Sequence, residues 1–239
     1  MLQLSKRLLA VADLAGTAKI LADVGTDHGY IPVYLVACGK IEKAIAMDIN
    51  QGPLMRAQEH IRFYGLNDQI ETRLSDGLLS LQPGESDIIV IAGMGGALMT
   101  KILSEGEAVA VSAKRLVLQP QSEIFAFRCF LLEHGYQITA ENMVYEDGKF
   151  YSMMAVEPGT SVSNTETGRF CQVSCKYGPL LIKQRHPVLL QYLKQQKDQK
   201  ERILSRLNAN ARQDVSGRRE EILKELAEIG TLLELWKEK

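Results

Sequence analysis

The feature that most restricts how this chain can fold is the regular alternation of short apolar runs and helical patterns over residues 1–156. Each apolar run has the length of a buried strand, and most of them end at a glycine or an acidic residue. The expected strands are 19–24, 43–47, 70–74, 87–92 and 115–118, and the expected helices are 2–14, 31–38, 52–64, 98–104 and 123–134. This alternation predicts an α/β fold with a mostly parallel sheet that helices cover on both faces.

The rest of the chain departs from this alternation. Residues 136–145 and 149–156 are expected to form an antiparallel hairpin beside the sheet, and 158–167 has the polar composition of a linker. From about residue 180 onward the apolar residues follow steps of three and four, which predicts two helices in an antiparallel coiled-coil hairpin. Two ordinary amphipathic helices packed on the sheet are the alternative. We therefore expect two domains, 1–160 and 161–239.

Charge separates these two parts of the chain. The 239 residues have a formal net charge of −1, but residues 1–174 carry −6 and residues 175–239 carry +5. The overall balance excludes a uniformly basic nucleic-acid coat. The basic segment is either the solvated face of a helix or a contact for a polyanionic partner. Its candidate contacts are Lys194, Lys197, Lys200, Arg202 and Arg206.

Composition indicates a globular protein, with 46% hydrophobic residues. Four cysteines are too few for a disulfide scaffold. Cys171, Cys175 and His186 lack the compact four-ligand spacing of a zinc site, so we expect no metal. No apolar run reaches the roughly 18 residues of a membrane span, and residues 1–15 lack the apolar core of a signal peptide. The expectation is a cytoplasmic protein with reduced thiols and no membrane segment.

The loop after the first expected strand, Gly25-Thr26-Asp27-His28-Gly29, differs from a phosphate-binding loop. Its glycines are spaced Gly-x-x-x-Gly rather than Gly-x-Gly-x-x-Gly, and a carboxylate at Asp27 would repel a pyrophosphate. A carboxylate suits a cationic or zwitterionic ligand, such as S-adenosyl-L-methionine (SAM), which carries an ammonium and a sulfonium and no phosphate. Taken alone, the loop is equally explained as a structural glycine turn.

Acidic residues also follow the next two strands. Asp48 lies 23 residues after Gly25, where a carboxylate can accept hydrogen bonds from ribose hydroxyls. Asp76, followed by Gly77, can accept from the exocyclic amine of adenine. Each of these residues alone is more often an ordinary surface or turn carboxylate. Acids at the ends of three successive strands together predict a ligand that contains adenosine.

The fourth expected strand ends in Gly93-Met94-Gly95-Gly96. We expect Gly95 and Gly96 to form a floor for the acceptor, although a helix start that needs small residues is the alternative. Tyr30 can stack on an acceptor base or be a core tyrosine. His28 is the only histidine in a candidate loop and can position a ligand or act as a base. No Gly-x-Ser-x-Gly or Walker A sequence is present, which argues against hydrolases and P-loop NTPases of those types.

Several motifs together resemble a known family. They are Leu21-Ala-Asp-Val-Gly-Thr-Asp-His-Gly-Tyr-Ile-Pro, Ala46-Met-Asp-Ile-Asn, Ser75-Asp-Gly, Ile91-Ala-Gly-Met-Gly-Gly, Leu118-Gln-Pro-Gln and Glu146-Asp-Gly-Lys-Phe-Tyr. In these motifs the sequence resembles the bacterial tRNA (adenine(22)-N1)-methyltransferase family, TrmK. The resemblance implies a class I SAM-dependent methyltransferase with a Rossmann-like, seven-stranded, mostly parallel sheet and a C-terminal coiled-coil domain. It further implies methylation of tRNA at N1 of adenine 22, in the D-arm region, with S-adenosyl-homocysteine (SAH) as product.

Roles for individual residues follow from this resemblance and from the loop positions. The expected cofactor-binding residues are Asp23, Gly25, Thr26, Asp27, His28, Gly29, Asp48, Ile49, Asp76, Gly77, Gly93 and Met94. The candidate catalytic residues are Asp27, His28, Tyr30 and Met94, and the candidate substrate contacts are Gly95, Gly96 and the five basic residues named above. Adenine N1 already holds an in-plane lone pair, so catalysis is expected to be mainly in-line positioning, with Asp27 near the cation that forms.

Other functions fit parts of the sequence. A SAM-dependent small-molecule methyltransferase, with a hairpin that serves dimerisation, would methylate without RNA. A non-enzymatic RNA-binding protein would bind tRNA without SAM. An NAD-dependent reductase is disfavoured by Asp27 in the glycine loop. With tRNA as the partner we expect a monomer, and the sequence leaves open which tRNAs are substrates.

Overall fold

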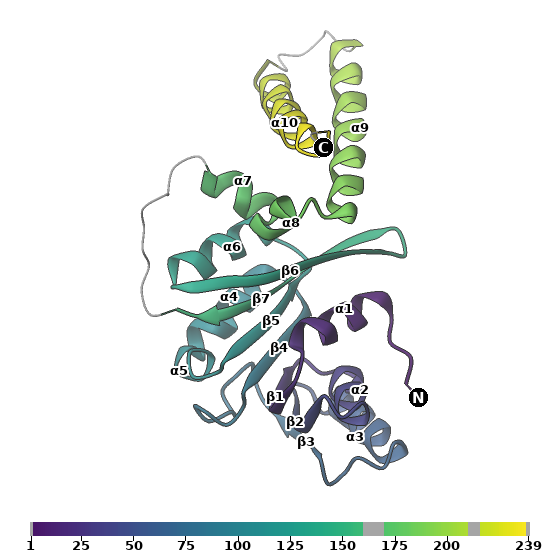
Figure 1. Ribbon diagram of the computed structural model, residues 1–239, viewed down its shortest axis with the longest axis vertical. Helices are drawn as coiled ribbons and strands as arrows, with labels where there is room; N and C mark the ends of the chain where they lie inside the picture. Colours follow the sequence, from purple (N-terminus) through teal and green to yellow (C-terminus); the bar gives the residue numbers. More distant parts are fainter. Residues whose placement is uncertain (1, 160–169, 210–215, 238–239) are drawn as a thin grey trace. The chain divides into compact units, whose positions relative to one another are not determined.

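The computed structural model describes residues 2–159, 170–209 and 216–237, and the chain divides into two compact units, Met1–Thr167 and Gly168–Lys239 (Figure 1). The strands of the first unit are β1 (Ala18–Val24), β2 (Ile41–Asp48), β3 (Ile70–Leu74), β4 (Ile88–Met94), β5 (Arg115–Pro120), β6 (Tyr136–Glu146) and β7 (Lys149–Pro158). Its helices are α1 (Lys6–Ala15), α2 (Tyr30–Ala37), α3 (Gln51–Phe63), α4 (Gly96–Glu105), α5 (Glu107–Ala110) and α6 (Ile124–Glu133).

The seven strands form one sheet in the order β3-β2-β1-β4-β5-β7-β6. Strands β1 to β5 are parallel neighbours, and β7 pairs antiparallel with both β5 and β6. This arrangement confirms the predicted seven-stranded, mostly parallel sheet. The strand order reverses between β1 and β4, and the carboxyl ends of strands at such a switch point are where ligands bind in sheets of this type.

Helices lie on both faces of the sheet (Figure 1), and each face has a separate hydrophobic cluster. On one face, helices α4 to α6 bury residues such as Met99 and Phe127 against Ile89 and Ile91 of β4. On the other face, helices α1 to α3 pack on the intervening strand residues, whose side chains point the opposite way, such as Val90. Because β4 is buried on both sides, its side chains are apolar without alternation, as the sequence indicated.

A buried ion pair joins α6 to the β6–β7 hairpin. Arg128 and Glu141 have side chains that are 1% and 0% exposed, and their Nη2 and Oε1 atoms lie 2.9 Å apart. Arg128 Nε also donates to the same Glu141 oxygen at 3.0 Å, and Nη2 donates to Ser152 Oγ of β7 at 2.8 Å. The pair therefore fixes the hairpin against the helix through charge-assisted hydrogen bonds.

Two elements differ from the sequence prediction at the carboxyl edge of the sheet. Strand β4 does not end at Ala92 but continues to Met94 through a register shift between Ala92 and Met94, with Gly93 at φ +82°. Helix α4 begins at Gly96, earlier than predicted, because Gly95 acts as its N-terminal cap residue. A bulge of this kind redirects the backbone, and here it turns Gly93 toward the ligand side of the sheet.

The second unit contains α7 (Phe170–Tyr177), α8 (Pro179–Lys183), α9 (Pro187–Ala209) and α10 (Ser216–Glu234). The helical pattern expected from residue 180 is interrupted before Pro187, which is placed at the start of α9. Lys200 pairs with Glu225, and Trp236 Nε1 donates to the Arg185 carbonyl, so α9 and α10 run antiparallel.

Leucine and isoleucine residues fill the contact within this unit. Leu189 and Leu193 of α9 and Ile222 and Ile229 of α10 are each no more than 1% exposed. Coiled-coil packing in the strict sense stays a prediction. The predicted domain boundary and most of the predicted linker 158–167 lie outside the described residues.

Candidate active site

Two cavities at the carboxyl edge of the sheet share Gly25, Ala92 and Gly93 in their walls. Cavity A has a volume of about 330 Å³ and is lined by Val24, Gly25, Asp48, Ile49, Ser75, Asp76, Gly77, Ala92, Gly93, Met94, Leu98 and Ile102. Cavity B has a volume of about 280 Å³ and is lined by Arg7, Leu8, Asp23, Gly25, Thr26, Asp27, Tyr30, Ile31, Ala92, Gly93 and Gln121. Most of the residues predicted for the cofactor site therefore line one cavity or both.

The β1–α2 loop is anchored by backbone hydrogen bonds to the next strand. The N–H groups of Gly25 and Thr26 both donate to the carbonyl of Met47, at 2.8 and 2.9 Å. Thr26 Oγ1 donates to Asp23 Oδ2 at 2.7 Å, and Asp23 is 4% exposed. Burial raises the pKa of Asp23 to about 6, with the Thr26 hydrogen bond opposing and nearby Asp48 adding to the rise. A carboxylate with a raised pKa at the wall of a cavity is a candidate partner for a cationic group.

Asp27 lies in the left-handed region at φ +49°, a conformation that aspartate tolerates better than most residues. Its Oδ1 accepts a hydrogen bond from Arg56 Nη2 of α3 at 2.6 Å, and its Oδ2 lies 3.7 Å from His28 Nε2. Sequence reasoning missed Arg56, which offsets the charge of Asp27. The carboxylate is therefore held in place by α3 and is less of an isolated negative charge than the sequence implied.

Gly25 and Gly93 both have positive φ angles, +74° and +82°, and both line the two cavities. A Cβ atom at Gly25 would lie 2.2 Å from Met94 Cε, so the methionine side chain passes directly over this glycine. The two cavities therefore share backbone at these two positions, and the Met94 side chain, which lines cavity A, covers Gly25.

Asp48 and Asp76 contribute to cavity A from the ends of β2 and β3. Asp48 is 8% exposed, and its Oδ1 accepts from the Asn50 backbone N–H at 2.9 Å. Asn50 is at the N-terminal cap position of α3, but its side chain makes no capping hydrogen bond. Its backbone N–H instead orients the Asp48 carboxylate.

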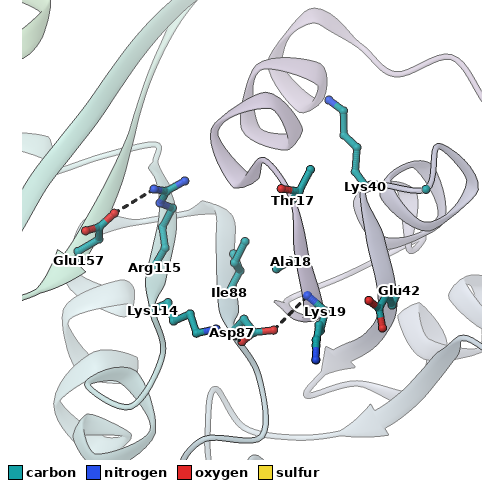
Figure 2. A pocket seen from close by; sticks show the side chains of 11 residues that line it. Thr17, Ala18, Lys19, Lys40, Glu42, Asp87, Ile88, Lys114, Arg115 and Glu157 are labelled. Atoms are coloured by element: carbon teal, nitrogen blue, oxygen red, sulfur yellow. Dashed lines mark hydrogen bonds and ion pairs between the residues drawn. The ribbon is translucent and has the colours of Figure 1, made fainter.

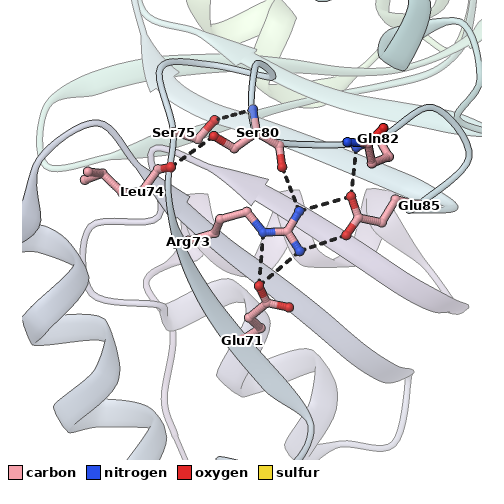
Figure 3. A network of polar contacts seen from close by, with 7 residues as sticks. All are labelled: Glu71, Arg73, Leu74, Ser75, Ser80, Gln82 and Glu85. Atoms are coloured by element: carbon pink, nitrogen blue, oxygen red, sulfur yellow. Dashed lines mark hydrogen bonds and ion pairs between the residues drawn. The ribbon is translucent and has the colours of Figure 1, made fainter.

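The loop that carries Asp76 is braced by a polar network centred on Arg73 (Figure 3). Arg73 pairs with Glu85 at 2.7 Å and Glu71 at 3.0 Å, and donates to the Ser80 carbonyl at 2.7 Å. Its hydrogen bonds lower the pKa of Glu85, with that from the Gln82 backbone adding to the effect. The network closes the turn after β3 and fixes the residues that face cavity A.

Aromatic rings form a chain beside cavity B. The His28 and Tyr30 rings stack with centroids 5.2 Å apart, and the Tyr30 and His60 rings form a T-shaped pair with centroids 5.0 Å apart. His60 Nδ1 donates to the His28 carbonyl at 3.0 Å, a contact that only the Nδ1–H form can make. Tyr30 is 38% exposed and lines cavity B, whereas His28 lines neither cavity.

Arg7 and Gln121 line cavity B although sequence reasoning gave them no role. Arg7 reaches the site from α1 and donates to Gln119 Oε1 at 2.9 Å, with its guanidinium 5.5 Å from the centre of the Tyr151 ring. Gln121 follows β5. It belongs to the Leu118-Gln-Pro-Gln motif, which was the available signal, whereas nothing local marked Arg7.

The structure does not bring all predicted residues to the cavities. Gly29 caps α2, and Gly95 and Gly96 line neither cavity. A Cβ at Gly96 would lie 2.7 Å from the Ser122 carbonyl oxygen, so close packing explains this glycine without a substrate. The roles of Gly95 and Gly96 as substrate contacts stay predictions.

The five basic residues on α9 differ in how available they are. Lys200 is 18% exposed and pairs with Glu225 at 2.5 Å, and Lys197 lies 3.7 Å from Glu201. Lys194, Arg202 and Arg206 are exposed. These three residues are therefore the better candidates for contact with a polyanion.

A larger cavity of about 610 Å³ lies at the opposite, amino-terminal edge of the strands (Figure 2). Its charges are largely paired with one another, Lys114 with Asp87 at 2.9 Å and Arg115 with Glu157 at 2.9 Å. Asp87 also accepts from the backbone N–H groups of Lys19 and Ile20. Because ligands of such sheets bind at the carboxyl edge, size alone does not make this cavity the active site.

Among the described residues, no group of three or more His, Cys, Asp or Glu side chains could hold a metal ion. The Cys171 side chain is not among those that the structure describes. Within the described ranges, no helix is long and apolar enough to cross a membrane.

The fold and the cavities at its switch point define a methyltransferase domain, and residues 4–154 match the family model described as "Methyltransferase domain". The tRNA (adenine(22)-N(1))-methyltransferase of Bacillus subtilis (strain 168) is 35% identical over 232 residues, which cover 97% of this chain and 96% of that protein. The chain belongs to the tRNA (adenine(22)-N(1))-methyltransferase family.

Solved structures agree over nearly the whole chain. Sp1610 of Streptococcus pneumoniae, solved in complex with SAM, is 33% identical with a TM-score of 0.82, over 97% of this chain and 100% of that chain. TrmK of M. capricolum, solved with the cofactor product SAH, is 27% identical with a TM-score of 0.79, over 97% and 98% of the two chains.

Proposed function

We propose that this protein transfers the methyl group of SAM to N1 of adenine 22 in tRNA. The observation that carries the proposal is the junction of cavities A and B, whose walls share Gly25 and Gly93, so that a cofactor in one cavity and an acceptor base in the other can come close together. The membership of the family defines the reaction and the nucleotide. A tRNA substrate supports a cytoplasmic location.

The residues present fit the cofactor. Asp48 and Asp76 offer carboxylates for the ribose hydroxyls and the adenine amine in cavity A, and Ile49 offers an exposed apolar surface for the ring. Buried Asp23, at the wall of cavity B, offers a carboxylate for the ammonium group. When bound, SAM supplies an electrophilic methyl group next to its sulfonium.

The protein's part in the reaction is to hold the base in position. N1 of adenine carries its own lone pair, so no residue has to remove a proton before attack, and orientation supplies most of the rate. Tyr30 offers a ring face on which the base can stack in cavity B. Asp27, fixed by Arg56, lies where it can stabilise the positive charge of the methylated base. N1 is on the Watson–Crick edge, so the base has to leave any pair before it enters.

Cofactor affinity is expected to depend on pH through Asp23. Its pKa of about 6 means that the free protein is largely protonated there at pH 5 and ionised at pH 7. Binding of an ammonium requires the ionised form, so affinity for SAM should fall about tenfold from pH 7 to pH 5. The folding stability of the cofactor-free protein depends on pH in the opposite sense. The contribution of Asp23 to this stability is present below pH 3.8 and is lost as the pH rises through about 6. Calorimetric titration with SAM measures the first effect.

The matched variant for this experiment is Asp23→Asn. It should bind SAM more weakly at pH 7 and show no such dependence on pH. A tenfold decrease that persists in Asp23→Asn would show that another group is responsible.

The exposed basic residues of α9 are proposed to contact tRNA phosphates. Replacing Lys194, Arg202 and Arg206 together with glutamine should weaken tRNA binding. The slope of the logarithm of the binding constant against the logarithm of the salt concentration should decrease in magnitude by roughly 0.7–0.9 for each lost contact. Lys200→Gln is the control from the same helix, because Glu225 already pairs with that ammonium. Filter binding of tRNA across a salt series measures both. An unchanged slope in the triple variant would remove α9 from the proposed interface.

Transfer of labelled methyl groups tests the proposed function against the small-molecule alternative. The full chain is incubated with methyl-labelled SAM and an unmodified tRNA transcript, and separately with a transcript in which guanine replaces adenine 22. Label should enter only the first RNA. Equal labelling of both transcripts would contradict the assigned nucleotide, and labelling of neither would contradict tRNA methylation.

A further inference from the structure

The segment that follows β5 places a side-chain amide against cavity B. Gln121 lines this cavity, and its backbone N–H donates to the Met94 carbonyl at 2.8 Å, which fixes the residue beside the bulge of β4. A Cβ atom at Gly93 would lie 3.7 Å from Gln121 Nε2. Over the part of the chain that the structure describes, this side chain makes no hydrogen bond to protein. Its donor and its acceptor are both available to a ligand.

Gln119, two residues earlier, shows that the two glutamines have different uses. It is fully buried, its Oε1 accepts from Arg7 at 2.9 Å, and its Nε2 donates to the Pro120 carbonyl at 3.2 Å. Both ends of Gln119 are therefore used by the protein, and they hold Arg7 at the wall of cavity B. Gln121 lies beyond the last paired residue of β5 and is exposed toward the cavity instead.

The chemistry of the acceptor base determines which of its atoms are left for recognition. Attack by N1 directs the Watson–Crick edge of adenine toward the methyl group, which leaves the exocyclic amine at N6 and the acceptor N7 on the other edge. Glutamine matches that edge, because its Oε1 accepts from the N6 amine while its Nε2 donates to N7. Guanine presents two acceptors, O6 and N7, in the same places, so the amide oxygen would face an acceptor.

We propose that Gln121 is a specificity-determining residue that binds the N6–N7 edge of the target adenine in cavity B. The proposal rests on the proposed function, since it requires an adenine acceptor whose N1 is methylated. Gly93 has no side chain beside the amide, so the base can approach Gln121 and the cofactor cavity together. The residue thereby selects adenine and orients its N1 at the same time.

Substitution of a single atom in the RNA tests this contact. A tRNA transcript is prepared by ligation with 7-deazaadenine at nucleotide 22, which replaces the N7 acceptor by C–H. The wild-type enzyme should lose about tenfold in kcat/KM on this RNA, the effect of losing one half of a bidentate contact. Gln121→Ala and Gln121→Glu should be slower on normal tRNA, but should change less than about threefold between the two RNAs. The 7-deaza change also alters the basicity of N1. For each enzyme we therefore take the ratio of kcat/KM on normal RNA to kcat/KM on 7-deaza RNA, and compare this ratio between the wild type and the variants.

The outcomes separate the inference from the function on which it rests. A loss on 7-deaza RNA that is confined to the wild type supports the contact, since a purely structural role of Gln121 would slow both RNAs equally. If the ratio of kcat/KM values on the two RNAs is the same for the wild type and Gln121→Ala, and the wild type methylates normal tRNA, only the proposed contact is overturned. Absence of transfer to normal tRNA by the wild type would overturn the proposed function. Calorimetry with SAM should give the same affinity for all three proteins, and a loss of cofactor binding in the variants would also count against the inference.

Discussion

Gly25→Ala is expected to lower kcat/KM by about 100-fold, because a misplacement of about 1 Å at the reacting atoms has an effect of that size. The new methyl group would enter the junction of cavities A and B, directly under the Met94 side chain. The φ of +74° adds backbone strain of about 1–2 kcal/mol for any residue with a Cβ. Steady-state kinetics with tRNA measure the loss of kcat/KM, and thermal unfolding measures the loss of stability.

Gly65→Ala is the matched control for this prediction. Gly65 has a similar φ of +69°, but nothing lies within 4 Å of its would-be Cβ, and it lines neither cavity. It should lose similar stability to Gly25→Ala and keep its activity. Equal activities of the two variants would show that the open junction at Gly25 is not required for methyl transfer.

Arg128→Met is expected to destabilise the first unit by about 3–5 kcal/mol, because it leaves the Glu141 carboxylate buried without its cation. For a unit of this size the melting temperature should fall by roughly 6–20 °C. Thermal unfolding followed by circular dichroism measures the shift. The effect concerns folding, since the pair ties α6 to the β6–β7 hairpin and lines neither cavity.

Two further variants show whether burial is the cause. The double variant Arg128→Met/Glu141→Leu should recover most of the lost stability, because it removes both charges together. Lys101→Gln, which breaks the exposed pair of Lys101 and Glu105, should change stability by less than about 0.5 kcal/mol. A double variant as unstable as Arg128→Met would show that packing of the arginine, not its charge, stabilises the hairpin.

Much of the first unit could be predicted because local patterns and the global fold agree. The buried strands are continuous apolar runs, and the turn at Asp147-Gly148 has the residues that a tight hairpin needs. The prediction was less accurate at the end of β4. A stretch with three glycines is typical of a loop, but here pairing with β5 extends the strand through Gly93 to Met94. Only the neighbouring strand supplies that information.

The same distinction holds for the site. Loop-end residues such as Asp48 and Gly25 were predictable because parallel strands bring their carboxyl ends to one edge. Arg56 and Arg7 were not, because each reaches the site from a helix through a contact distant in sequence. His60 likewise reaches the site from a helix, through its contacts to the His28 carbonyl and the Tyr30 ring.

Identification of the methylated atom decides directly whether this protein methylates tRNA at N1 of adenine 22. An unmodified tRNA transcript is incubated with the full chain and methyl-labelled SAM, digested with nucleases, and its labelled nucleoside is identified and positioned by mass spectrometry. We expect N1-methyladenosine at nucleotide 22 and nowhere else. N6-methyladenosine, a methyl group at another nucleotide, or an unlabelled RNA from protein that binds SAM would contradict it.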